Sequence, residues 1–133
     1  VDDYAHHPTE VAATLEAARQ AFPHGRVIAV FQPHLFSRTR DLASEFGKAL
    51  LAANFVLVTD IYPSREEPLP DVHAMLVVEA ARESGHRHVE YRGEWREAAE
   101  VLAEEVGEGD VVLTLGAGDI YRLAEELSAE GAR

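Results

Sequence analysis

Residues 26–31 read RVIAVF, and after the first arginine this is a short apolar run typical of a strand buried inside a sheet. Similar runs stand at residues 55–59 (FVLVT) and 111–115 (VVLTL), and a weaker one stands at residues 88–91. The strong runs do not alternate between apolar and polar residues, so each strand is expected to be covered on both faces. The sequence therefore predicts a central sheet between two layers of helices.

Helical patterns separate these strands. Apolar residues recur every three or four positions in five segments, at residues 9–22, 41–53, 71–83, 94–106 and after residue 118. Asp71 is the expected N-cap of the third segment. Strands joined by helical crossovers of this length run parallel. We therefore expect a single α/β domain over residues 1–133, Rossmann-like and three-layered, with a mainly parallel sheet and helices on both faces.

The composition argues against several classes of function. Asp and Glu number 24 against 12 Lys and Arg, and the formal net charge of −12 argues against binding to nucleic acid or to an anionic membrane surface. No apolar run approaches the roughly 20 residues that a membrane-spanning helix needs. The chain has no cysteine, which excludes disulfides and thiol chemistry and fits a cytoplasmic location.

The chain also lacks the G-x-x-x-x-G-K-[ST] phosphate loop, since its one lysine, Lys48, stands in a helical pattern. It begins with Val1 rather than with Met. We therefore expect a fragment of a longer protein, one that cannot hold ATP with the usual phosphate loop.

Polar residues follow the first predicted strand, where ligands of a parallel sheet bind. Residues 32–40 read QPHLFSRTR and precede a predicted helix. Arg38 can bind a carboxylate or phosphate with two hydrogen bonds, and a helix start adds partial positive charge. His34, Ser37 and Arg38 are therefore candidates for an anion site. The alternative is that Ser37 or Thr39 caps the helix and the arginines are surface residues.

Two further loops follow strands. Residues 116–119 (GAGD) would let a backbone approach a ligand, although the third glycine of the dinucleotide fingerprint is missing and Asp119 could simply cap the last helix. The acidic loop at residues 60–67 could bind a metal or a hydroxylated ligand, or no ligand at all.

The N-terminal residues 2–8 (DDYAHHP) are dense in polar side chains. Adjacent histidines point apart and no third His or Cys stands nearby at helical spacing, so we predict no metal site. A histidine here is better suited to a hydrogen bond with a ligand carboxylate or a neighbouring domain.

Four motifs, spread in order along nearly the whole chain, resemble those of the C-terminal domain of the Mur ligases. They are DDYAHHPTE at residues 2–10, FQPHLFSRTRDL at 31–42, DIYPSREEP at 60–68 and LGAGDIY at 115–121. The FQPH-x-x-SRT pattern looks more like the branch that adds L-alanine to UDP-N-acetylmuramate. A related branch that adds a peptide shares the DD-aromatic-x-HHP opening and is the alternative.

The resemblance implies one domain of a three-domain enzyme. The N-terminal domain holds the UDP-sugar, the central domain carries the ATP phosphate loop, and the C-terminal domain closes over the central one. ATP phosphorylates the lactyl carboxylate of UDP-N-acetylmuramate, and the amine of L-alanine attacks the acyl phosphate. Mg²⁺ on the ATP phosphates is held mainly by the central domain. This chain alone is then expected to be inactive.

The resemblance also implies roles for single residues. Asp3 would face the ribose of ATP and Tyr4 its adenine. His6 would lie near the reacting carboxylate and the incoming alanine. Arg38 would pair with the alanine carboxylate, so that His6 and Arg38 are the expected catalytic residues.

The remaining implied roles are supporting ones. His34 and Ser37 would shape the substrate loop, and Gly116, Gly118 and Asp119 would lie beside the same cleft and help to bind ATP. Many relatives have Arg where this chain has Leu35. This leaves Arg38 as the main cationic contact, with Arg40 as a candidate substitute.

Two other classes of function remain open. A binding module for a nucleotide at residues 116–119, or for an anion at Arg38, would show clear affinity in isolation. A stand-alone α/β enzyme would use His6 or His34 as acid–base group with a carboxylate partner, Asp3 or Asp119, and would turn over without other domains. The missing phosphate loop favours the ligase domain.

Overall fold

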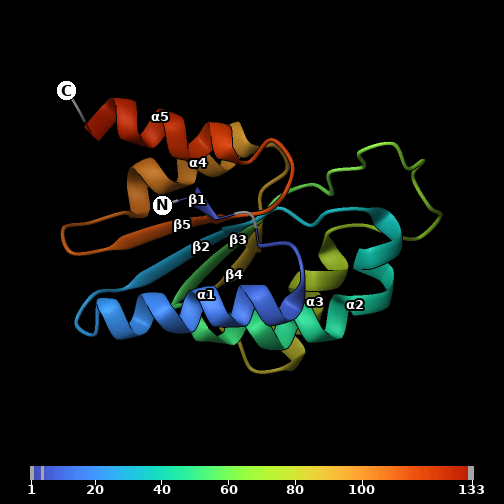
Figure 1. Ribbon diagram of the computed structural model, residues 1–133, viewed down its shortest axis with the longest axis horizontal. Coiled ribbons are helices and arrows are strands. Elements are labelled where there is room, and N and C mark those ends of the chain that lie inside the picture. Colours follow the sequence, from blue (N-terminus) through green and yellow to red (C-terminus); the bar gives the residue numbers. More distant parts are fainter. Residues whose placement is uncertain (1, 4, 132–133) are drawn as a thin grey trace.

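The computed structural model describes residues 2–3 and 5–131 of the chain. Its sheet contains five parallel strands in the order β1-β5-β2-β3-β4 (Figure 1). The strands are β1 (Asp2–Asp3), β2 (Val27–Phe31), β3 (Phe55–Val58), β4 (Val89–Tyr91) and β5 (Val111–Leu115). The predicted parallel sheet is confirmed, and RVIAVF supplies its middle strand.

Helices cover both faces of the sheet, which confirms the three-layer architecture (Figure 1). One layer contains α1 (Pro8–Ala21), α2 (Phe36–Ala49), the short 3₁₀ helix η1 (Leu50–Ala52) and α3 (Met75–Glu83). The other layer contains α4 (Trp95–Glu105) and α5 (Tyr121–Gly131). Each connection from one strand to the next therefore carries the chain over one face of the sheet.

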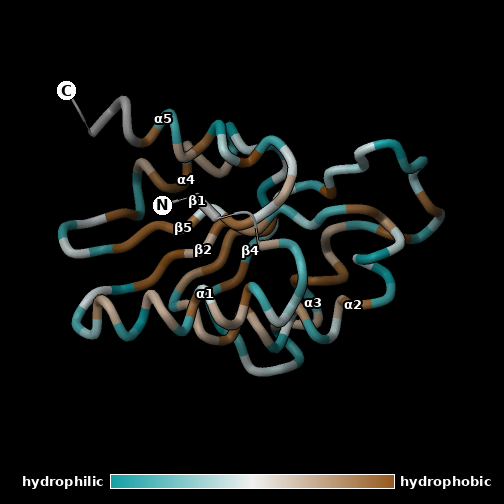
Figure 2. Tube along the Cα trace, viewed as in Figure 1, coloured by the Kyte–Doolittle hydropathy of each residue, from teal (hydrophilic) through white to brown (hydrophobic). Residues whose placement is uncertain are grey.

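The strand β2 contributes to two separate hydrophobic clusters. Val27, Ala29 and Phe31 pack toward the layer of α1, α2 and α3, whereas Ile28 and Val30 pack toward α4 and α5. All five side chains are fully buried. Figure 2 shows the strands as the apolar centre of the molecule, with hydrophilic residues gathered in the outer loops. The unbroken apolar run in the sequence reflects burial on both faces of the sheet.

The strand β1 was not expected from the sequence. Asp2 and Asp3 pair with Thr114 and Leu115 of β5 and extend the sheet by one short parallel strand. A strand of two acidic residues has no apolar pattern to reveal it. It forms because the edge of β5 offers unpaired backbone groups.

The helix α2 begins at Phe36, five residues before the predicted start. Ser37 and Arg38 therefore lie in its first turn and not in a loop. The predicted start was wrong because the N-cap residue is Leu35, which has φ = 70° and makes no side-chain capping bond. Residues 37–40 are all polar, and the buried position among them is Thr39, so this first turn shows no apolar period in the sequence.

The helix α3 begins at Met75, so the prediction that Asp71 is its N-cap was wrong. Asp71 has φ = 62°, and the N–H of Met75 donates instead to Nδ1 of His73 at 3.0 Å. Residues 60–74 consequently form a long loop, which projects beyond the carboxyl ends of the strands (Figure 1, green).

The helices α2 and α3 pack very closely at Gly47. A Cβ atom on Gly47 would lie 2.6 Å from the carbonyl carbon of Ala80 and 2.7 Å from the nitrogen of Ala81. These are backbone atoms, which cannot rotate away as a side chain could. The two helices can approach this closely only because position 47 has no side chain.

The substitution Gly47→Ala should therefore lower the free energy of unfolding by about 1–3 kcal/mol, since the added methyl group forces the helices apart. Urea unfolding followed by circular dichroism measures this change. Gly107→Ala is the matched control, because its nearest neighbouring atom, Oδ2 of Asp110, lies 3.8 Å from the added Cβ. Equal unfolding free energies for the two variants would contradict the close packing.

Candidate functional site

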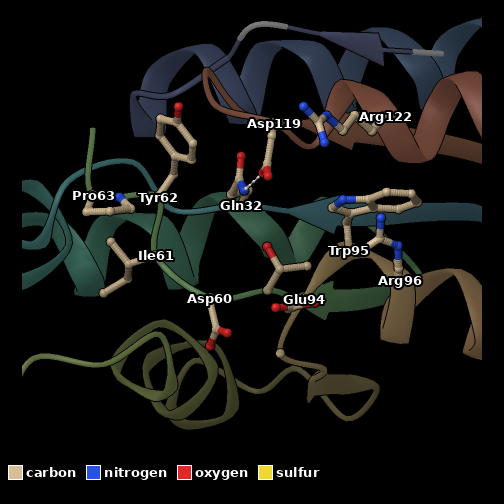
Figure 3. Close-up of a pocket in the computed structure, with 12 residues that line it drawn as sticks. Gln32, Asp60, Ile61, Tyr62, Pro63, Glu94, Trp95, Arg96, Asp119 and Arg122 are labelled. Carbon is tan, nitrogen blue, oxygen red and sulfur yellow. Dashed lines mark hydrogen bonds between the residues drawn. The ribbon is translucent and has the colours of Figure 1, made fainter. Parts of the chain in front are cut away.

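The loops that follow β2 and β5 are joined by a buried amide. Gln32 Nε2 donates a hydrogen bond of 2.6 Å to Asp119 Oδ1, and the N–H of Ile120 donates to Gln32 Oε1 at 3.2 Å (Figure 3). Gln32 is only 6% exposed. The carboxylate of Asp119 is thus held by a side chain from a neighbouring strand end. Sequence analysis missed Gln32, although its position directly after β2 is where such residues are found.

The two predicted glycines pack against the same loops. Gly116 has φ = 153°, and a Cβ there would lie 3.0 Å from the carbonyl oxygen of Gln32. A Cβ on Gly118 would overlap the ring of Tyr62 and lie 2.6 Å from Gln32 Oε1. Both positions need glycine because a neighbouring chain segment occupies the space of a side chain.

Three of the predicted site residues form a cluster at the carboxyl edge of the sheet. The rings of His6 and His34 lie 6.0 Å apart at 70°, and Nη1 of Arg38 lies 3.3 Å from Nδ1 of His34. His34 also stacks on the ring of Tyr62, with centroids 5.9 Å apart. Within the part of the chain that the structure describes, Arg38 makes no ion pair, so its guanidinium can accept an external carboxylate.

The contact with Arg38 determines the tautomer of His34. A guanidinium can only donate, so Nδ1 of His34 must accept and the ring proton sits on Nε2. Burial is the largest cause that lowers the pKa of His34, and the positive charges of Arg38 and His6 lower it further. His34 is therefore neutral near pH 7.

Ser37 is bonded to a residue that sequence analysis did not single out. Its N–H donates to Glu66 Oε1 at 2.9 Å, and its hydroxyl donates to Glu66 Oε2 at 2.5 Å. These bonds lower the pKa of Glu66. Thr39 donates to the carbonyl oxygen of Leu35, so neither Ser37 nor Thr39 is the N-cap. The sequence offers no signal that would separate Glu66 from Glu67.

The other arginine of this segment has a partner of its own. Arg40 Nε donates to Asp41 Oδ1 at 2.9 Å, on the exposed side of the helix. Leu35 is half-buried and contributes no charge. Arg38 is therefore the arginine of this segment that contacts His34.

Gln32 also lines a pocket of about 370 Å³ (Figure 3). Its lining includes Asp119 and Tyr62, but not His6, His34 or Arg38. Thr59 also lines it, and the buried hydroxyl of Thr59 has no hydrogen-bond partner within the described residues. The predicted site residues thus fall into two neighbouring groups, with Gln32 and Tyr62 between them.

The acidic loop that begins at Asp60 is used in part for structure. The hydroxyl of Tyr91 donates to Asp60 Oδ1, and burial followed by this contact raises the pKa of Tyr91 to about 12. Within the described residues, no group of three or more His, Asp or Glu side chains could hold a metal ion. No described helix is long and apolar enough to cross a membrane.

Two predicted residues cannot be compared with the structure. Tyr4 lies outside the described residues. Asp3 is described only as backbone, in β1, so its side chain also lies outside.

Comparison with known sequences identifies close relatives. A family model described as Mur ligase, glutamate ligase domain, matches residues 1–118. A UDP-N-acetylmuramate–L-alanine ligase from Cutibacterium acnes is 58% identical over 120 residues, which are 90% of this chain and 25% of that protein. The ligase of the same name from Salinibacter ruber is 50% identical over 125 residues, 94% of this chain and 26% of that protein. The chain spans about a quarter of these relatives.

Solved structures share the fold. The crystal structure of UDP-N-acetylmuramate-alanine ligase MurC from Thermotoga maritima matches with a TM-score of 0.73 at 28% identity, over 96% of this chain and 26% of that chain. A murein peptide ligase from Psychrobacter arcticus matches with a TM-score of 0.75 over 96% of this chain and 26% of that chain. At 16% identity, the second likeness concerns the fold alone.

Titration of the His34 ring followed by NMR should give a midpoint below the usual pKa of 6.5. The substitution Arg38→Met should raise this midpoint, since it removes a positive charge and a donor from Nδ1. Arg40→Met is the control, because Asp41 and not His34 is its partner. A titration midpoint at or above 6.5, or one that Arg38→Met leaves unchanged, would contradict the conclusion that Arg38 helps to keep the His34 ring neutral.

The same shift has a consequence for stability. At pH values between the lowered pKa of the folded chain and the usual 6.5, the unfolded chain binds more protons at His34 than the folded chain does. The contribution of His34 therefore lowers the free energy of unfolding as the pH falls from neutrality through this range, and Arg38→Met should weaken this dependence.

Proposed function

The chain belongs to the Mur ligase family, and we propose that it forms the C-terminal domain of an ATP-dependent ligase that joins L-alanine to UDP-N-acetylmuramate in peptidoglycan synthesis. In this proposal residues 1–133 are one domain of a three-domain enzyme. The observation that carries it is the cluster of His6, His34 and Arg38, which lies at the edge of the sheet where ligands of parallel sheets bind.

Arg38 would bind the carboxylate of L-alanine. Its Nη1 faces the neutral ring of His34, so its remaining N–H donors can form the paired hydrogen bonds that suit a carboxylate. A neutral His34 orients the guanidinium without adding a second charge. The expected substrate-binding residues are therefore His6, His34, Ser37 and Arg38, with Ser37 acting through the shape of the helix start.

His6 would lie beside the reacting carbonyl. When the amine nitrogen of alanine bonds to the carbonyl carbon of the acyl phosphate, negative charge develops on the carbonyl oxygen before phosphate leaves. A hydrogen-bond donor at His6 and the positive charge of Arg38 would stabilise that charge. His6 is 28% exposed, and its Nδ1 lies 3.8 Å from Glu10 Oε1, which limits the positions of its ring. Closure over the central domain would exclude water from the acyl phosphate.

This domain would contact the ribose and adenine of ATP but not its phosphates. The loop at residues 116–119 leaves little room for a triphosphate, because Asp119 is already bonded to Gln32 and Tyr62 fills the space at Gly118. We therefore assign the phosphates and Mg²⁺ to the other domains. Asp3 and Tyr4 remain the proposed contacts for ribose and adenine, with the GAGD loop as support. An enzyme that consumes ATP in this way would work in the cytoplasm.

A ligase that adds a peptide is the second candidate. The pocket beside Gln32 is larger than an alanine side chain requires, and it contains the Thr59 hydroxyl, which no described residue hydrogen-bonds. Relatives named as alanine ligases at 50% and 58% identity favour the first candidate.

Steady-state kinetics of the full-length ligase test the role of Arg38. Arg38→Ala should raise KM for L-alanine about 10- to 100-fold, the loss expected when a paired, charged hydrogen bond is removed. The KM for ATP should change little. Arg40→Ala is the matched control, since that arginine is bound to Asp41 and should leave all constants close to those of the unmodified enzyme.

Other outcomes would exclude the proposal. An unchanged KM for L-alanine in Arg38→Ala would show that Arg38 does not bind the carboxylate of L-alanine. Activity with a peptide but not with L-alanine would support the second candidate. Turnover by the isolated chain would exclude a closing domain and point to a stand-alone enzyme.

A further inference from the structure

The helix α2 lacks an N-cap from its own sequence. The residue at that position is Leu35, whose side chain cannot accept a hydrogen bond and whose backbone has φ = 70°. The N–H groups of the first helical turn have no partner within the helix and must be satisfied from elsewhere. Arg38 lies in this turn, so whatever completes the turn also determines where its guanidinium points.

Glu66 supplies the missing cap from a position 29 residues further along the chain. Both of its carboxylate oxygens are bonded to Ser37, one to the N–H and one to the hydroxyl, at 2.9 Å and 2.5 Å. Hydrogen bonds to an ionised carboxylate are stronger than neutral ones, and a negative charge at a helix N-terminus is favourable. The lowered pKa of Glu66 keeps this carboxylate ionised at neutral pH.

The bond between Glu66 and Ser37 also ties down the long loop. Among the described residues, no other residue of the segment 63–69 is hydrogen-bonded to a helix or strand. At the base of the loop, the N–H of Leu35 donates to the carbonyl oxygen of Tyr62 at 2.9 Å. The start of α2 is therefore held on both sides by the same loop.

The geometry points to Glu66 as the positioning residue for Arg38, and this inference rests on the proposed role of Arg38 in binding the amine substrate's carboxylate. By completing the first turn of α2, Glu66 holds Arg38 in the place where Nη1 reaches His34. Because the Glu66 carboxylate already binds the helix N-terminus, an external carboxylate would bind the guanidinium of Arg38 instead. Glu66 itself does not touch the substrate.

Kinetics of the full-length ligase with varied L-alanine and ATP test this inference. Glu66→Ala should raise KM for L-alanine about fivefold to tenfold while kcat stays within about twofold, since the guanidinium is displaced but not removed. Glu66→Gln should have a smaller effect, because its amide oxygen still accepts from the N–H of Ser37. Glu67→Ala is the matched control, as Glu67 is an exposed neighbour with no hydrogen bond in the described structure.

A double substitution separates the effect of the Glu66–Ser37 hydrogen bonds from an effect on general stability. If Glu66 acts through Ser37, the variant that combines Glu66→Ala with Ser37→Ala should have the same KM for L-alanine as Glu66→Ala alone. A purely structural role would lower the melting temperature and the active fraction without moving this KM. If Glu66→Ala does not fold, Ser37→Ala and Glu66→Gln must still raise KM for L-alanine above the value of Glu67→Ala.

The outcomes distinguish this inference from the function on which it rests. An unchanged KM for L-alanine in the folded Glu66 and Ser37 variants, with a raised KM in Arg38→Ala, would overturn the positioning role alone. An unchanged KM in Arg38→Ala would overturn the proposed carboxylate contact and with it the role of Glu66.

Discussion

Burial of β2 on both faces is the constraint on which the rest of the structure depends. Its alternate side chains join two hydrophobic clusters, one with α1, α2 and α3 and the other with α4 and α5. Because every strand runs parallel, all strand ends that lead into helices meet at one edge of the sheet. The polar segments after β2, β3 and β5 are thereby brought together, although long helices separate them in the sequence.

At that edge, most polar groups are already satisfied by one another. Gln32 binds Asp119, and Glu66 binds Ser37. Arg38 differs, since its described contact is to a neutral ring nitrogen and not to a carboxylate. A charged group of this kind gains most from an external anion, because no internal partner has to be displaced. The arrangement suits a domain that contributes binding groups and not a nucleophile.

The cluster of His6, His34 and Arg38 could be anticipated from the sequence because each residue stands next to a strand or helix end in a recognisable motif. The role of Glu66 could not be anticipated, because residues 65–68 (REEP) contain two adjacent glutamates and nothing in the sequence distinguishes them. The position of Gln32 directly after β2 could have marked it as a candidate, but the sequence did not show that its amide would bind Asp119. The prediction of a helix start at residue 41 failed because the cap of α2 comes from a distant loop.

The sequence by itself determined the α/β class, the parallel strands and the three layers, because hydrophobic periodicity is a local property that each element carries alone. It also determined which side chains were available at the strand ends. Only the tertiary structure decided the strand order, the pairing of Asp2 and Asp3 with β5, and the choice of Glu66 as the cap of α2. These features depend on distances between segments remote in the chain, and the packing of the whole sheet sets those distances.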